Sequence, residues 1–178
     1  MAKVISYQMA SNSVCTASTE GANKFAVTLR PVTPEDEDFL YRVYVGTRED
    51  ITQLGWNEKQ LEKFLRLQFM AQQKQYKAQF CDADFQIVLE DEKPVGRLYI
   101  NQSEEEIRIV DIALLPEFRG QGMGSSLLKQ VLAAGKKKRL PVRIHVRPSN
   151  PAFHLYERLG FQKIDENGIY FLMEWTSN

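Results

Sequence analysis

The feature that most constrains this chain is a glycine-rich turn at residues 119–125, with the sequence Arg-Gly-Gln-Gly-Met-Gly-Ser. An apolar run from Ile107 to Leu115 precedes it, and apolar residues at helical spacing follow over residues 127–132. A strand that turns into a helix in this way leaves backbone N–H groups unpaired at the positive end of the helix dipole. Glycines permit positive φ angles and let a bulky group approach the backbone. We therefore expect a phosphate or pyrophosphate to bind here.

Two common nucleotide-binding motifs do not fit this turn. A Walker loop requires the sequence Gly-Lys-Ser/Thr, and the turn contains no lysine. A Rossmann fingerprint requires glycine at the position of Ser125 and an early place in a βαβ unit. Two alternatives remain: a different phosphate-binding loop, or a turn that only joins a strand to a helix.

Length and composition limit the class of protein. A chain of 178 residues is expected to form one domain with its own core, and its formal net charge of zero gives no basic footprint for nucleic acid. No apolar run approaches the ~18 residues of a membrane span. Cys15 and Cys81 lack metal-ligand spacing, so we expect no metal and a reduced, cytoplasmic setting. Residues 1–23 lack the apolar core of a secretory signal and are expected to be a poorly ordered leader or to add a strand, with the domain at 24–178.

Apolar spacing predicts an α/β domain with the element order β-α-α-β-β-β-α-β-α-β-β. Alternation predicts strands at 25–30, 85–90, 95–101, 104–115, 141–147, 161–164 and 169–175, with turns at 91–94 and 165–168. Helical spacing and capping residues predict helices after Thr33, from about 57 to 80, from the glycine turn to about 138, and over 151–159.

Two blocks of this sequence resemble the GNAT superfamily of N-acyltransferases. The first is Asp-Ile-Ala-Leu-Leu-Pro at 111–116 followed by Arg119-x-x-Gly122-x-Gly124, which resembles the acyl-CoA-binding motif. The second covers residues 144–161, including Ser-Asn-Pro-Ala and Leu-Tyr-Glu-Arg-Leu-Gly-Phe. The resemblance extends over about residues 25–176 and is closest in pattern to ribosomal-protein-alanine and small-molecule amine acetyltransferases.

The resemblance implies a fold and a set of partners. The fold is a mixed, mostly antiparallel sheet of about seven strands flanked by about four helices, with the fourth and fifth strands parallel and splayed apart. The implied partners are acetyl-CoA, as cosubstrate, and an amine acceptor that is a small molecule or a peptide N-terminus, without metal, nucleic acid or membrane, in a monomer or homodimer. The residues implied to bind acetyl-CoA are Ile112, Ala113, Leu114, Arg119, Gly120, Gln121, Gly122, Met123, Gly124, Ser125, Asn150 and Tyr156.

Transfer of an acetyl group to an amine requires a base for the amine proton and an acid for the departing thiolate. The resemblance implies Tyr156 as the acid, since a phenol with a pKa near 10 stays protonated at neutral pH; the alternative is a ring that packs under the last strands. His145 matches the position of the base in relatives that acetylate protein N-termini, and its alternative is a half-exposed strand histidine. Glu106 and Asp111 are rival bases, each otherwise a solvated strand carboxylate. His154 is expected at the surface.

The spacing of the second block departs from the family by one residue. Only residues 151–155 separate Asn150 from Tyr156, where relatives usually carry one residue more. Counting back from Tyr156 places Ser149 and Ile144 at the matching positions, whereas counting along the strand places Asn150 and His145 there; we keep the latter pair.

The sequence also bears on the reaction route, on an alternative function and on the acceptor. Neither cysteine lies in either block, which favours direct transfer over a thiol intermediate. A non-catalytic CoA-binding or partner-binding module on the same fold is the alternative function. The resemblance implies that the acceptor is bound by residues 41–79 and 165–168, without selecting among polyamines, amino acids, aminoglycosides and peptide termini.

Overall fold

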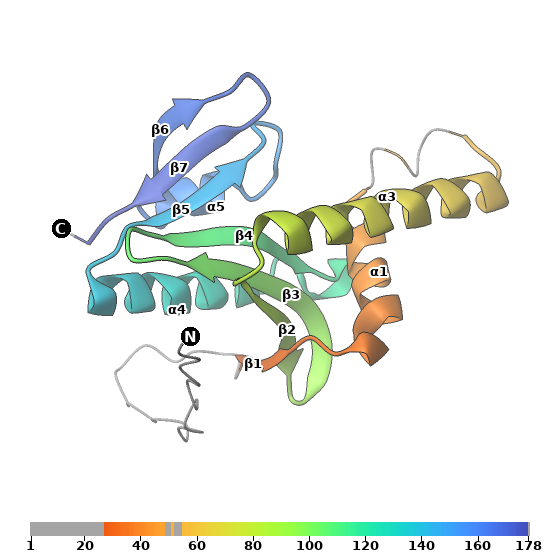
Figure 1. Ribbon diagram of the computed structural model, residues 1–178, viewed down its shortest axis with the longest axis horizontal. Helices are drawn as coiled ribbons and strands as arrows, with labels where there is room; N and C mark the ends of the chain where they lie inside the picture. Colours follow the sequence, from red (N-terminus) through yellow and green to blue (C-terminus); the bar gives the residue numbers. More distant parts are fainter. Residues whose placement is uncertain (1–26, 49–50, 52–54, 178) are drawn as a thin grey trace, which may run out of the picture.

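The computed structural model describes residues 27–48, 51 and 55–177, so the leader predicted at 1–23 lies outside the described residues. One sheet contains seven strands in the order β1-β2-β3-β4-β5-β7-β6 (Figure 1). The strands are β1 (Val27–Pro31), β2 (Asp84–Glu90), β3 (Lys93–Gln102), β4 (Ile107–Leu114), β5 (Val142–Val146), β6 (Gln162–Glu166) and β7 (Phe171–Trp175). The helices are α1 (Glu37–Val45), α3 (Glu58–Gln79), α4 (Met123–Lys138) and α5 (Phe153–Arg158), with 3-10 turns η1 (Pro34–Asp36) and η2 (Pro116–Phe118). The predicted fold class and element order are confirmed.

The helices cover the two faces of the sheet with separate cores. Leu127 and Val131 of α4 and Tyr156 of α5 pack in the larger cluster against one face. Tyr44 of α1 and Phe69 of α3 pack in a second cluster on the opposite face. This division places α4 and α5 behind the sheet and α1 and α3 in front of it, as Figure 1 shows. The amphipathic spacing of each helix follows from burial on one side only.

Local side-chain chemistry explains where several elements begin and end. Asn57 caps α3 because its side chain accepts a hydrogen bond from the Gln60 N–H at 2.9 Å. Ser103 Oγ accepts from the N–H groups of Glu105 and Glu106, each at 3.1 Å, and this turn separates β3 from β4. The predicted start of the fourth strand at residue 104 is therefore wrong, because the strand begins at Ile107.

The turn between β2 and β3 is shorter than the sequence indicates. Asp91 and Glu92 both have positive φ angles, 46° and 65°, so a two-residue turn joins the strands. Such turns match the twist of the flanking strands. The predicted turn over 91–94 is wrong at its second half, because Lys93 and Pro94 pair with Glu90 and Leu89 in the ladder.

Candidate active site

The centre of the sheet opens between its two parallel strands. β4 and β5 pair only from Ile107 to Ile109 and from Val142 to Ile144. β4 then continues to Leu114, while β5 continues to Val146 and pairs only with β7. The splayed fourth and fifth strands that the resemblance implied are thus present. Backbone groups of β4 beyond Ile109 face an opening on this side instead of a neighbouring strand.

A β-bulge lies at the start of this opening. Tyr99 is opposite Asp111 and Ile100 is opposite Ile109, which leaves Val110 as the extra residue of β4. A bulge places two consecutive side chains on one face of a sheet. Val110 accordingly packs with the α1 and α3 side, whereas Ile112 packs with the α4 side. Asp111 is thereby turned toward α3.

The glycine turn continues directly from the end of β4. Arg119 fixes the turn, because its Nε donates to the Leu114 carbonyl at 3.0 Å and one of its terminal nitrogens donates to the Gly46 carbonyl at 2.8 Å. Gly120 and Gly122 have positive φ angles of 71° and 94°, and a Cβ added at either would meet no atom within 4 Å. The backbone of the turn is therefore open on the outside.

The first turn of α4 offers unpaired amide groups. Gly122 is the N-cap residue and provides no side chain, and the Ser126 N–H, which donates to the Gly122 carbonyl at 3.0 Å, makes the first main-chain bond of the helix. In the described part of the chain, no acceptor is bonded to the N–H groups of Met123, Gly124 and Ser125. The Met123 side chain is fully buried in the core, so this residue presents only its backbone. These amides fit a pyrophosphate.

Tyr156 projects from α5 into the core beside the opening. Its ring packs edge-on against Phe161 with centroids 5.7 Å apart, and only 3% of the residue is exposed. Burial raises the pKa of Tyr156 above its ordinary value, and the negative charge of Asp111 adds to this shift. The phenol therefore keeps its proton at neutral pH. Packing and proton donation are compatible roles for this residue.

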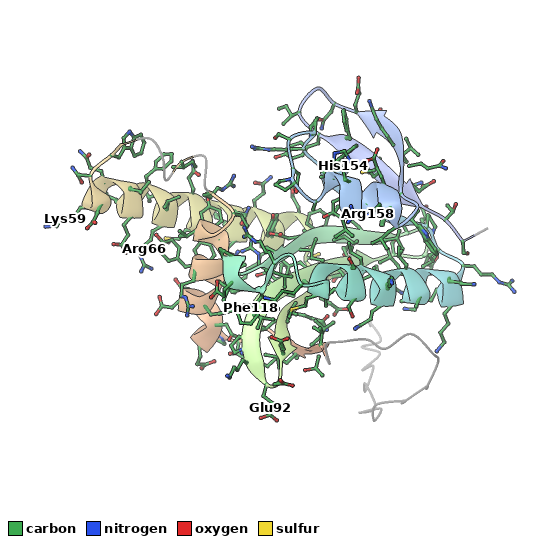
Figure 2. The ribbon with its side chains drawn as sticks, turned by 180° about the vertical axis from the view of Figure 1, so that it is seen from behind. Lys59, Arg66, Glu92, Phe118, His154 and Arg158 are labelled. Carbon is green, nitrogen blue, oxygen red and sulfur yellow. The ribbon has the colours of Figure 1, made fainter. Side chains whose placement is uncertain are left out.

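Asn150 and His154 lie at the surface near Tyr156. The Asn150 side chain accepts a hydrogen bond from the Ala152 N–H at 2.8 Å and so shapes the entry to α5. His154 is exposed on α5 (Figure 2) and its Nδ1 lies 2.9 Å from a Glu157 oxygen, as expected for a surface residue.

His145 lies on the exposed side of β5, with Val142, Ile144 and Val146 buried on the other side as the alternation predicts. Its Nδ1 lies 2.9 Å from an Arg108 nitrogen. A guanidinium group can only donate, so Nδ1 accepts and the remaining proton of the neutral ring is on Nε2. Burial lowers the pKa of His145, and the charge of Arg108 lowers it further. Its lone pair is thus already used by Arg108.

The two rival carboxylates are paired, and the expectation of solvated strand carboxylates is wrong for both. Glu106 accepts from Arg108 at 2.8 Å and from Arg143 at 2.9 Å. Burial opposes its charge, but these two arginines lower the pKa of Glu106 below its usual value. Asp111 is bonded to Arg97 at 2.7 Å and is only 15% exposed. Sequence patterns missed Arg143 and Arg97 as partners because these two pairs join different strands.

Arg97, the buried partner of Asp111, was not predicted from the sequence. It is 1% exposed and stands within the apolar strand Val-Gly-Arg-Leu-Tyr-Ile at 95–100. A charged residue inside such an apolar run predicts that the residue is buried with an oppositely charged partner, and the sequence offers no other sign of the Arg97–Asp111 pair.

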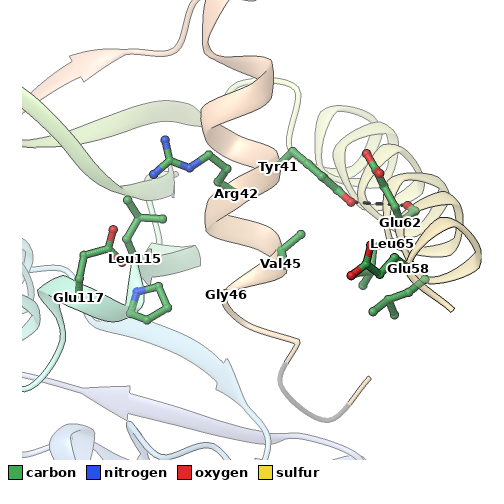
Figure 3. Close-up of a pocket in the computed structure, with 11 residues that line it drawn as sticks. Tyr41, Arg42, Val45, Gly46, Glu58, Glu62, Leu65, Leu115 and Glu117 are labelled. Carbon is green, nitrogen blue, oxygen red and sulfur yellow. Dashed lines mark hydrogen bonds between the residues drawn. The ribbon is translucent and has the colours of Figure 1, made fainter. Parts of the chain in front are cut away.

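A cavity of about 530 Å³ lies on the α1 and α3 side, next to the end of β4 (Figure 3). It runs between the C-terminal half of α1 and the N-terminal half of α3, both within the segment 41–79. Its lining residues are Tyr41, Arg42, Val45, Gly46, Glu58, Leu61, Glu62, Leu65, Leu115, Pro116 and Glu117. The cavity therefore combines apolar walls with carboxylates and one arginine.

This arrangement agrees with what comparison with known proteins finds. A sequence model of the Acetyltransferase (GNAT) family matches residues 35–161. The chain belongs to the GNAT family. It is 31% identical over 85 residues to the [ribosomal protein bS18]-alanine N-acetyltransferase of Haemophilus influenzae, an alignment that covers 47% of this chain. The chain spans only 58% of the length of that relative.

Solved GNAT-type structures share the fold. The PaiA N-acetyltransferase of Thermoplasma acidophilum, crystallised with coenzyme A, superposes with a TM-score of 0.63 at 21% identity over 85% of this chain and 99% of that one. An acetyltransferase from Thermus thermophilus gives a TM-score of 0.61 at 21% identity, covering 85% and 97%. At this level of identity the likeness concerns the fold.

The described residues contain neither a metal-binding group of side chains nor a membrane-spanning helix. Over residues 27–48, 51 and 55–177, no three His, Cys, Asp or Glu side chains are grouped so that they could hold a metal ion. No helix in the same residues combines the length and apolar character needed to cross a membrane.

Proposed function

We propose that this protein transfers an acetyl group from acetyl-CoA to a primary amine, directly and within a ternary complex, in the cytoplasm. The observation that carries this proposal is the opening between β4 and β5, with the uncapped start of α4 at one end and the Tyr156 phenol beside it. A phosphate-binding turn next to a buried proton donor suits a thioester substrate that carries a diphosphate.

Acetyl-CoA would be held by backbone groups more than by side chains. The amides from Gly120 to Ser125 would receive the pyrophosphate at the positive end of α4. The free edge of β4 from Ile112 to Leu114 would pair with the amide groups of the pantetheine arm, as a strand would. Arg119 holds the turn in shape, and Asn150 lies at the entry to α5 on the far side of the opening.

In the proposed reaction the amine nitrogen attacks the thioester carbonyl, so that a C–N bond forms and the C–S bond breaks. Tyr156 donates its proton to the departing sulfur, which leaves as a thiol. The attacking nitrogen gives up a proton to a base. His145 stays a candidate for this base, but it first has to release Arg108 from Nδ1.

The cavity beside the end of β4 is the proposed site of the acceptor. Glu58, Glu62 and Glu117 outnumber Arg42 in its lining, which favours an acceptor with a positive charge beyond the reacting amine. The Haemophilus influenzae relative acts on an alanine of a ribosomal protein, so a peptide N-terminus is one acceptor to test.

Release of free thiol from acetyl-CoA with a panel of amines tests the function. Tyr156→Phe should lower turnover by roughly 10²-fold, the usual scale for a general acid, with little change in CoA affinity measured by calorimetry. His154→Ala, on the exposed side of the same helix, is the matched control and should behave like the wild type. Heat of binding without thiol release would instead identify a non-catalytic CoA-binding module.

A further inference from the structure

A buried polar cluster joins α3 to the sheet at the bulge of β4. Arg97 of β3 donates through one terminal nitrogen to Asp111 Oδ2 at 2.7 Å and to Gln72 Oε1 at 3.2 Å. The Tyr76 hydroxyl of α3 donates to the same Asp111 oxygen at 3.1 Å. Tyr99 packs edge-on against Tyr76, with ring centroids 6.0 Å apart, and closes the cluster.

The cluster fixes the position of the Asp111 side chain. Burial is the largest influence on the pKa of Arg97 and lowers it, but Asp111, Tyr99 and Tyr76 together raise that pKa above its ordinary value, so Arg97 stays charged. Burial together with the Asp111 charge raises the pKa of Tyr76, so its hydroxyl remains a donor. A buried charge pair costs free energy to desolvate and is weak support for stability by itself. A pair that costs desolvation energy and adds little stability is consistent with a functional role for the Asp111 carboxylate.

The two oxygens of Asp111 differ in their surroundings. Oδ2 accepts from both Arg97 and Tyr76. Oδ1 receives no hydrogen bond from any residue within the described ranges, and the Asp111 side chain is 15% exposed while that of Arg97 is 1% exposed. Arg97 and Tyr76 therefore fix Oδ2, whereas Oδ1 keeps its capacity to accept a hydrogen bond, and the carboxylate as a whole is partly exposed.

Asp111 also lies at the right place along β4. It follows the bulge at Val110, just beyond the last residue of β4 that pairs with β5. Burial, and after it the charge of Asp111, raises the pKa of Tyr156. Asp111 lies on the α3 side of the sheet, where it is bonded to Tyr76, and Tyr156 packs in the core on the α4 side, so the two groups border the opening from different sides. The base and the acid of a direct transfer must flank the reacting carbonyl in this way.

We propose that Asp111 is the catalytic residue that receives the proton of the acceptor amine, through Oδ1, while Arg97 and Tyr76 act as positioning residues on Oδ2. This inference rests on the proposed function. The amine arrives neutral and donates an N–H hydrogen bond to Oδ1. As the C–N bond forms, the nitrogen becomes positively charged and acidic, its proton passes to Asp111, the C–S bond breaks, and the sulfur takes the proton of Tyr156. Solvent then removes the proton from Asp111 and returns one to Tyr156.

The central test compares Asp111→Asn with Asp36→Asn. Asp36 also pairs with an arginine, Arg30, at the β1 edge, far along the sheet order from the opening. Because Arg30 is 37% exposed, this control reproduces the loss of an aspartate–arginine pair away from the site in a less buried setting. Asp111→Asn should lower kcat by roughly 100-fold, the scale for a general base, and Asp36→Asn should leave it within threefold. A second readout does not depend on activity. Amine binding to the complex with CoA, measured by calorimetry, should weaken about tenfold in Asp111→Asn only, through loss of a charged hydrogen-bond acceptor.

A second variant covers the case in which Asp111→Asn does not fold. Arg97→Gln/Asp111→Asn removes both charges, so no unpaired charge remains buried. It should fold and show the same loss of kcat with unchanged CoA affinity. Full activity in a folded Asp111→Asn or in the double variant would overturn this inference and leave the proposed function standing. If kcat then fell in His145→Ala instead, the base would be His145. Wild-type protein that binds CoA but releases no thiol with any amine would overturn both proposals.

Discussion

The three glycines after β4 serve different physical needs. Gly120 and Gly122 have positive φ angles, which other residues adopt at a cost of about 1–2 kcal/mol. Gly124 lies inside the first turn of α4, where its backbone conformation suits any residue. A Cβ there would lie 3.8 Å from Leu155 Cδ2 and 4.0 Å from Leu114 Cδ1, which is ordinary contact. The fold therefore does not require glycine at 124, and its missing side chain leaves room for a ligand.

Gly124→Ala consequently separates binding from stability. The free protein should be as stable as the wild type or about 0.5 kcal/mol more stable, because alanine favours a helix. CoA should bind roughly tenfold more weakly, because the added methyl group, beside Leu114 and Leu155, would narrow the space next to the proposed pyrophosphate site. Urea unfolding and calorimetry measure the two quantities. Gly122→Ala, as the control, should lose both stability and binding; unchanged CoA affinity in Gly124→Ala would contradict this account of the turn.

Asp36 gives a prediction for acid stability. Its carboxylate accepts from Arg30 at 2.6 and 2.7 Å and from the Thr33 N–H at 2.8 Å. The hydrogen bond from Arg30, followed by that from Thr33, outweighs burial and lowers the pKa of Asp36 from 3.8 to about 2. Because the folded-state pKa is depressed, the stabilisation is complete above about pH 4 and is lost as the pH falls toward 2.

Comparing wild type with Asp36→Asn isolates this contribution. The wild type should be more stable by about 1–2 kcal/mol at pH 7, a value reduced because Arg30 is partly exposed. The difference should shrink between pH 4 and pH 2, as measured by urea unfolding at each pH. A difference that stays constant down to pH 2 would show that the charge of Asp36 is not its source.

Among the elements, β3 and β4 depend on one close approach. A Cβ at Gly96 would lie 2.4 Å from the Ala113 carbonyl oxygen and 2.6 Å from Leu114 Cδ2. The backbone oxygen cannot move aside without shifting β4, so glycine is needed for the strands to pair at this point. The same residues of β4 form the edge proposed for the pantetheine arm.

Gly96→Ala should therefore disturb both the sheet and the site. We expect a loss of about 2–3 kcal/mol in the free energy of unfolding, as for other overpacked positions. CoA affinity should fall as well, because Ala113 and Leu114 shift. The measurements are urea unfolding and calorimetry, with Gly124→Ala as the comparison at a roomy glycine. A loss below 0.5 kcal/mol would contradict the close contact.

The elements also show which features sequence could predict. α3 and its Asn57 cap were predictable because helical spacing and capping depend on neighbouring residues. The length of the 91–92 turn was not, since the sign of φ at Asp91 and Glu92 cannot be read from residue type. The bulge at Val110 was hidden for a similar reason: it depends on the register between β3 and β4. The pairing of Asp111 with Arg97 follows from that bulge.

The whole molecule joins two helical layers at one opening in the sheet. The uncapped start of α4 and Tyr156 lie on one face, and the cavity between α1 and α3 lies on the other. A thioester in the opening would be reached by CoA-binding groups from the first face and by an acceptor from the second. This division explains why contiguous sequence motifs mark the proposed CoA-binding half of the site. The second half is built by α3 and by strand register, which leave no contiguous motif.

Binding of CoA should stabilise the whole molecule, because the turn and β4 are ordered together only in the folded state. A ligand at 100 times its Kd stabilises the folded state by about 2.7 kcal/mol. For a chain of this size, that free energy corresponds to a rise in Tm of roughly 5–10 °C. Thermal unfolding with and without CoA measures the shift. Tyr156→Phe should retain the full shift, since its phenol acts in chemistry, whereas Gly124→Ala should lose part of it at the same CoA concentration. No shift in the wild type with either CoA or acetyl-CoA would remove the basis for the proposed function.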